Sequence, residues 1–191
     1  MHMTPEKEAI FNVLNHGLSL LTLIGFILLV VLFVDLFGLY FKVWSGERKV
    51  YKLLARYVLP LGFFVTLGAM AISLYYSDYL GILPCGLCWF QRVSIYSLVF
   101  IFGYGWWKKD YRSLEYATVL SLAGLPVALY HEYLQLGYSE LIPCPAIVST
   151  IDCAKPTFIE YYFITFPFMS VVLLGGVLLM SYIVMRYKHN V

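Results

Sequence analysis

Five long apolar stretches restrict the possible fold of this sequence more than any other feature. They run over residues 18–40, 57–76, 89–107, 114–136 and 161–185. A helix that crosses the hydrocarbon core of a bilayer needs about 20 consecutive, mostly apolar residues. Charged residues make up 13% of the chain, whereas soluble domains carry about 25%. The sequence therefore predicts an all-α integral membrane protein, with residues 1–191 forming a single domain in the lipid bilayer.

The lysine and arginine residues alternate between the connectors and indicate how the helices are oriented. The basic connectors 41–56 and 108–113 and the C-terminal tail hold Lys42, Arg48, Lys49, Lys52, Arg56, Lys108, Lys109, Arg112, Arg186 and Lys188. The other two connectors, 77–88 and 137–160, contain a single basic residue, Lys155. By the positive-inside rule, the basic regions face the cytoplasm. We therefore expect the N-terminus and both other connectors outside, and the C-terminus in the cytoplasm. The net charge of +2 suggests no nucleic-acid partner.

All four cysteines lie in the two connectors that are expected outside: Cys85 and Cys88 in the first, Cys144 and Cys153 in the second. An oxidising compartment favours disulfides over a zinc site. Two disulfides are therefore expected, and no metal. Two alternatives stay open: a non-enzymatic membrane protein with two structural disulfides, and a metal or haem binder that uses the cysteines and His131. Metal analysis of the purified protein would test the second.

The first pair has the spacing of a redox couple. Cys85 and Cys88 would close a small ring, which stabilises a fold little compared with a long-range bridge, and this spacing accompanies depressed thiol pKa values. The pair also lies where a connector enters a helix, whose N-terminus favours a thiolate. Arg92 follows Cys88 by about one helical turn. We expect its permanent charge to stabilise a Cys88 thiolate and to hold a negative or carbonyl-bearing ligand; the alternative is that it snorkels to the headgroups.

The second pair, in "PCPAIVSTIDC", lies in a polar connector. Taken alone, Cys144 and Cys153 would be read as a structural clip of that connector. Two cysteine pairs on one side of so small a protein also permit a relay, because thiol–disulfide exchange passes two electrons between pairs without a metal.

Three segments of the chain together resemble the DsbB/BdbC family of disulfide-bond formation proteins: "SDYLGILPCGLCWFQR", "ALYHEYLQLG" and "IPCPAIVSTIDCAKPTF". The resemblance covers about residues 57–185. The vitamin K epoxide reductase family has similar chemistry, but its loop cysteines precede its CxxC motif, unlike the order found here. The resemblance implies a four-helix transmembrane bundle around the redox site, in the prokaryotic inner membrane. The N-terminal stretch is then one additional helix whose role is open.

The resemblance also implies an activity and roles for six residues. It implies that a soluble DsbA-like thiol oxidase of the thioredoxin fold is reoxidised, with a bound quinone, ubiquinone or menaquinone, as the electron acceptor. Cys85 and Cys88 match the quinone-linked disulfide, and Arg92 matches an arginine that contacts the quinone. The pair that faces the soluble partner would be Cys144 and Cys153, with Cys144 the site of the mixed disulfide.

His131 matches, through the same resemblance, a histidine near the quinone. A histidine titrates near neutral pH and could deliver a proton to the reduced quinone; the alternative is an interfacial polar residue bound to water or a headgroup. Glu132 beside it is expected to have no role at the site. Asp35 is an acid within the first stretch, and its place near the cytoplasmic end favours helix packing or snorkelling over a functional role.

Overall fold

The computed structural model describes residues 4–40, 49–144 and 152–189. Five α-helices make up most of the described chain: α1 (Pro5–Tyr40), α2 (Lys49–Leu74), α3 (Gly86–Lys108), α4 (Ser113–Gln135) and α5 (Phe166–His189). A short π-helix, η1 (Tyr75–Tyr79), continues α2. Each of the five contains a segment long and apolar enough to cross a membrane. The all-α membrane fold expected from the sequence is therefore confirmed.

Three helix starts differ by five residues or more from those expected from the apolar stretches alone. The second helix begins at Lys49 rather than near residue 57. The first helix begins at Pro5 rather than near residue 18, because its polar N-terminal part packs through Phe11 against the end of α2. The last helix begins at Phe166 rather than at Tyr161. Tyr161 has φ 50°, a left-handed conformation that interrupts a helix, and Glu160 forms a bridge with Ile164.

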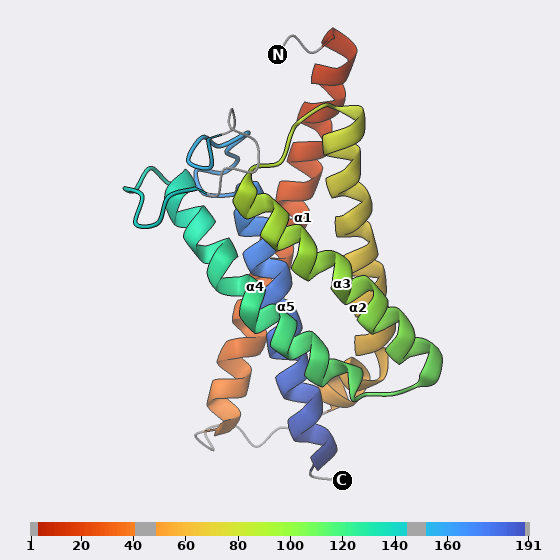
Figure 1. Ribbon diagram of the computed structural model, residues 1–191. Helices are drawn as coiled ribbons and strands as arrows, with labels where there is room; N and C mark the ends of the chain where they lie inside the picture. Colours follow the sequence, from red (N-terminus) through yellow and green to blue (C-terminus); the bar gives the residue numbers. More distant parts are fainter. Residues whose placement is uncertain (1–3, 41–48, 145–151, 190–191) are drawn as a thin grey trace.

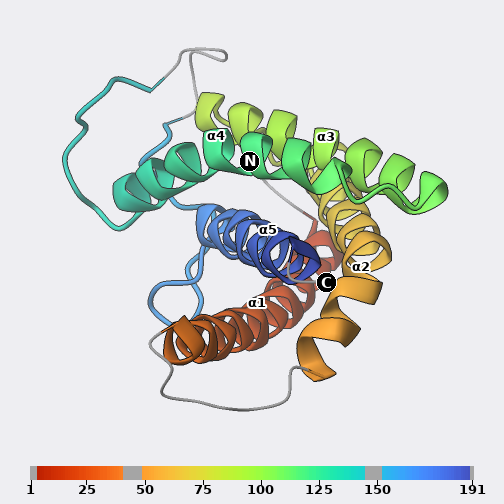
Figure 2. The same cartoon turned by 90° about the horizontal axis from the view of Figure 1, so that it is seen from below.

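Helices α2 to α5 form a bundle, and α1 lies against one side of it. Seen along the helices, α5 lies between α3 and α4 on one side and α1 on the other (Figure 2). The core of the bundle is apolar and fully buried at its centre, with Leu98, Phe102, Leu114, Ala117, Ala128 and Leu174 as main members. This arrangement agrees with a four-helix bundle plus an additional N-terminal helix.

Helices α3 and α4 approach each other closely at Gly124. A Cβ atom at this position would lie 2.7 Å from the Ser94 Oγ of α3 and 3.1 Å from a methyl carbon of Leu174 in α5. Three helices therefore meet at a residue without a side chain, as is common in membrane bundles. This contact brings the outer halves of α3 and α4 together, and these halves carry Gln91 and His131.

Both cysteine-bearing connectors lie at the same end of the bundle (Figure 1). The first follows η1 and leads to Cys85, which caps the N-terminus of α3. The second follows α4 and returns to α5 through the turn at Glu160–Ile164. The end of the bundle at which α2 begins and α5 ends lies opposite (Figure 1).

Candidate redox site

The site is built on the first turn of α3, where Cys85 and Cys88 lie together as free thiols. Cys85 is the N-cap residue, and its Sγ accepts the backbone N–H of Cys88 at 3.4 Å. The two Sγ atoms are hydrogen-bonded at 3.0 Å. The capping geometry thus brings both sulfurs to the positive end of the helix dipole, which favours a thiolate.

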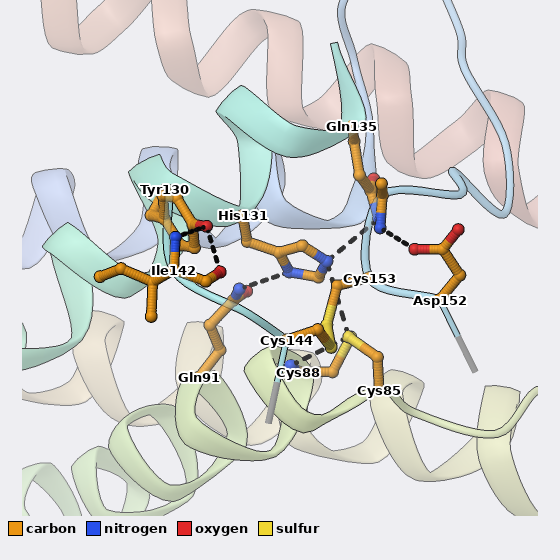
Figure 3. Close-up of a disulfide and its surroundings, with 11 residues drawn as sticks. Cys85, Cys88, Gln91, Tyr130, His131, Gln135, Ile142, Cys144, Asp152 and Cys153 are labelled. Atoms are coloured by element: carbon orange, nitrogen blue, oxygen red, sulfur yellow. Dashed lines mark hydrogen bonds between the residues drawn. A yellow bond between two sulfur atoms is a disulfide. The ribbon is translucent and has the colours of Figure 1, made fainter. Parts of the chain in front are cut away.

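His131 of α4 lies directly against this pair and is fully buried. Its Nε2 atom is 3.6 Å from the Sγ of Cys85. The side-chain Nε2 of Gln91 lies 2.9 Å from Nδ1, and that of Gln135 lies 3.2 Å from Nε2 (Figure 3). When Gln91 donates to Nδ1, the ring proton is on Nε2 and faces the sulfur of Cys85.

These contacts lower the pKa of Cys85 well below the usual range of a thiol. The main cause is the hydrogen bond to the Cys88 thiol; the hydrogen bond and charge of His131 act in the same direction, and burial opposes both. The sequence led us to expect the thiolate at Cys88, beside Arg92. The described contacts favour it at Cys85 instead.

Arg92 makes its described contacts with α2 and with its own helix. Its guanidinium donates a 2.9 Å hydrogen bond to the backbone oxygen of Ser73, one residue before α2 ends, and it lies 5.5 Å from the ring of Trp89. Among the residues that the structure describes, no hydrogen bond or ion pair joins Arg92 to Cys88. The arginine therefore bridges α3 and α2 next to the thiols.

The second pair, Cys144 and Cys153, forms a disulfide with Cα atoms 6.0 Å apart. Of the two disulfides expected, the structure therefore holds this one, while Cys85 and Cys88 are free. Cys153 is fully buried in the same apolar cluster as Cys85, and Cys88 and Cys144 pack at its margin (Figure 3). The fold thus brings together two cysteine pairs that are far apart in the sequence, one as a disulfide and one as a dithiol. Residues 145–151, between the members of the second pair, lie outside the described residues.

The thiols and His131 also have the geometry that the metal-binding alternative requires. The Sγ atoms of Cys85 and Cys88 and a ring nitrogen of His131 all lie within 4.8 Å of one another. Structural zinc sites have four protein ligands and catalytic sites three, and the described residues supply three. This alternative therefore stays a question for metal analysis.

Sequence reasoning missed the residues that support His131. Gln91 and Gln135 are uncharged amides within apolar stretches, and only their spacing from Cys88 and His131 could have drawn attention to them. Glu132 was expected to have no role at the site. It is buried and accepts a hydrogen bond from the Thr165 hydroxyl, away from the thiols. Thr165 in turn accepts the backbone N–H of Phe168 at 3.3 Å, so the carboxylate ties α4 to the N-terminus of α5.

Comparison with known proteins agrees with this geometry. The family model described as disulfide bond formation protein DsbB matches residues 55–184. The chain belongs to the DsbB family. The SPbeta prophage-derived disulfide bond formation protein B of Bacillus subtilis is 42% identical over 115 residues, which cover 60% of this chain and 75% of that protein. No solved structure matches significantly.

Two further relatives of this DsbB-family chain carry similar names. The probable disulfide formation protein C 2 of Bacillus cereus is 31% identical over 129 residues, 67% of this chain and 91% of its own length. The disulfide bond formation protein C of Bacillus subtilis is 35% identical over 111 residues, 56% of this chain and 78% of its own length. The chain is thus a multi-pass, disulfide-forming membrane oxidoreductase, as the resemblance implied. The matched region begins after α1.

Proposed function

We propose that this DsbB-family protein is a membrane thiol:quinone oxidoreductase that reoxidises a soluble, DsbA-like protein of the thioredoxin fold. The observation that carries the proposal is the shared cluster, in which the Cys144–Cys153 disulfide packs beside the free thiols of Cys85 and Cys88. A protein with two structural disulfides would have no need of a dithiol at the first pair. The arrangement suits an enzyme in which one pair is oxidised while the other is reduced.

The first exchange takes place at the disulfide between Cys144 and Cys153. A thiolate of the reduced soluble protein attacks the Sγ of Cys144, the sulfur at the margin of the cluster, and Cys153 leaves as a thiolate. The second thiol of the soluble protein then attacks this mixed disulfide and releases Cys144. The soluble protein leaves with a disulfide, and Cys144 and Cys153 hold its two electrons as a dithiol.

The second exchange carries these electrons to Cys85 and Cys88. The Cys144–Cys153 dithiol reduces the Cys85–Cys88 disulfide, so one S–S bond forms as the other breaks and the electron count is unchanged. His131 donates from Nε2 to the sulfur of Cys85 and stabilises it as a thiolate, while Gln91 donates to Nδ1 and holds the ring in place.

The residues around the dithiol fit a quinone. Trp89 is 43% exposed on a surface that lipid would cover, and Arg92 beside it has five N–H donors, one of which is bound to Ser73. An apolar ring with carbonyl oxygens suits such a site. A quinone, when bound there, accepts the two electrons and two protons that Cys85 and Cys88 give up as their disulfide forms. Arg92 would hold a carbonyl oxygen and stabilise negative charge that develops on it, and His131 would supply a proton near the dithiol.

The test is oxidation of a reduced thioredoxin-like substrate by the purified protein, with ubiquinone and menaquinone analogues compared. We expect two substrate thiols to be consumed for each quinone that is reduced. Cys88→Ser and Cys144→Ser should each abolish turnover, and Arg92→Met should weaken quinone dependence more than folding. Turnover of Cys88→Ser at the wild-type rate would refute the relay. Stoichiometric zinc or haem in the active preparation would favour the metal-binding alternative.

A further inference from the structure

The N-terminal helix contacts the chain on both sides of the redox site, although it lies outside the region that matches the family. Most of its surface faces away from the protein. Two of its buried residues, Phe11 and Asn15, instead meet η1 and the segment that leads into α5. These are the connectors that precede Cys85 and follow Cys153. The contacts therefore bear on the site and not only on the attachment of a fifth helix.

The strongest of these contacts is a buried hydrogen bond. The hydroxyl of Tyr76 donates to the Oδ1 of Asn15 at 2.6 Å, and the two residues are only 3% and 2% exposed. A buried polar group that loses its partner bears the full cost of its desolvation. Tyr76 belongs to η1, and its backbone oxygen accepts the N–H of Ile82 at 3.0 Å. Asn15 thus fixes Tyr76, and Tyr76 in turn holds Ile82, which lies three residues before Cys85.

Aromatic rings extend this contact to the other connector. Phe11 packs edge-on against Tyr76 and Phe158, with ring centroids 5.9 and 6.4 Å away. Phe166 completes the group, 4.9 Å from Tyr76 and 4.6 Å from Phe158. We call Phe11, Tyr76, Phe158 and Phe166 the outer aromatic cluster. It links η1, the return segment after Cys153 and the start of α5 through one residue of α1.

Two further polar contacts extend from α1. Lys7 donates to the backbone oxygen of Tyr79 at 2.5 Å and lies 4.9 Å from its ring. His16 lies 3.7 Å from the carboxylate of Glu160, at the turn before α5. Helix α1 therefore contacts η1 through Lys7 and Asn15, and the return segment through Phe11 and His16.

We propose that α1 is a built-in positioning element of the redox site, in which Asn15 and Phe11 hold the connectors of the two cysteine pairs at a separation that allows exchange between them. The reason is geometric, because exchange needs an attacking sulfur to reach a disulfide along a narrow approach. A small displacement of reacting groups costs a large factor in rate. Asn15, Phe11 and Tyr76 touch no reacting atom and act through the connectors.

The test uses the full-length protein in lipid nanodiscs and three single variants. Asn15→Leu and Tyr76→Phe each remove one partner of the buried hydrogen bond, and Tyr76→Phe keeps the ring, so folding is preserved. Asn12→Leu is the matched control, because Asn12 is an exposed asparagine on the same helix. One equivalent of a reduced dithiol protein is added, the reaction is stopped by alkylation, and mass spectrometry follows which pair is oxidised over time. The reduction potential of the Cys85/Cys88 pair is measured separately against a thiol buffer.

We expect transfer between the pairs to slow by about 5-fold or more in Asn15→Leu and Tyr76→Phe, and to be unchanged in Asn12→Leu. The double variant should be no slower than the slower single variant, since both remove one interaction. Wild-type rates and an unchanged potential in Asn15→Leu and Tyr76→Phe would overturn the proposal, as would an equal loss in Asn12→Leu. The inference rests on the proposed relay, but the outcomes differ. Absence of transfer in the wild-type protein would refute the relay, and a shifted potential in Asn15→Leu but not in Asn12→Leu would still support the role of α1.

Discussion

At the scale of single residues, the contacts in the structure favour the thiolate at Cys85, whereas the sequence favoured it at Cys88. The sequence pointed to Cys88 because Arg92 follows it by one helical turn. The guanidinium of Arg92 is bound to Ser73. The Sγ of Cys85, in contrast, accepts the backbone N–H of Cys88, is hydrogen-bonded to the Sγ of Cys88 and contacts His131. Short-range donors outweigh a cation at the same end of the helix, because hydrogen bonds to the thiolate act at contact distance.

The first prediction concerns the reactivity of Cys85 as a function of pH. A lowered pKa means that the thiolate is present above the lowered value and disappears only when the pH falls through it. Cys85 of the reduced protein should therefore react with iodoacetamide at mildly acidic pH, where an ordinary thiol does not. Cys88→Ala should shift this profile upward more than His131→Phe, because the hydrogen bond of Cys88 is the larger cause. Peptide mass spectrometry after alkylation measures the shift; an ordinary thiol profile for Cys85 in the wild-type protein would contradict the prediction.

At the scale of helices, the site depends on how closely α3 and α4 approach each other. Gln91 is on α3 and His131 on α4, and their 2.9 Å contact exists only while the two helices are in place. Gly124 permits that approach, since a Cβ there would overlap Ser94. The packing of two helices at one glycine thus influences the orientation of a histidine nearly two turns away.

The second prediction is that Gly124→Ala destabilises the bundle by about 1–3 kcal/mol, the usual cost of overpacking. It should also raise the pH at which Cys85 becomes reactive, because Gln91 and His131 move apart. Thermal unfolding in detergent and the alkylation profile measure the two effects. Gly68→Ala is the matched control, since no atom lies within 4 Å of a Cβ built there, and alanine is favoured over glycine in a helix. Equal melting temperatures for the two variants would contradict the prediction, because they would show that α3 and α4 accommodate a methyl group at Gly124 without cost.

At the scale of the whole molecule, both cysteine connectors lie at one end of the bundle (Figure 1). The relay requires this end to face the compartment of the soluble partner. The positive-inside rule assigns it to the outside, because the basic connectors belong to the other end. That this end faces outward is therefore a prediction that rests on the charges of the connectors.

The third prediction tests this orientation by labelling in cells. In a background whose four cysteines are replaced by serine, Tyr162→Cys should react with a membrane-impermeant maleimide on intact cells, because Tyr162 is 97% exposed at the cysteine end. Lys108→Cys, exposed at the end of α3, should react only after permeabilisation. The opposite pattern would reverse the topology and place the site in a reducing compartment, where the proposed relay could not work.

The sequence by itself determined the membrane fold, the expected orientation and the two cysteine pairs. These depend on hydropathy, on charge in the connectors and on spacing within a few residues, all of which are local properties of the chain. Helix starts were less predictable, because contacts of Phe11 extend α1 beyond its apolar part and the left-handed turn at Tyr161 delays α5.

Only the tertiary structure decided which groups surround the thiols. The contact of His131 with Cys85, its contact with Gln91, and the bond between Asn15 and Tyr76 all join residues of different elements. Gln135 alone lies one turn from His131 on the same helix. A uniformly apolar helix shows no stripe in its sequence that tells which face meets a neighbour. In a membrane protein the pattern of apolar residues therefore determines that the helices form, while packing between them determines what the reactive sulfurs contact.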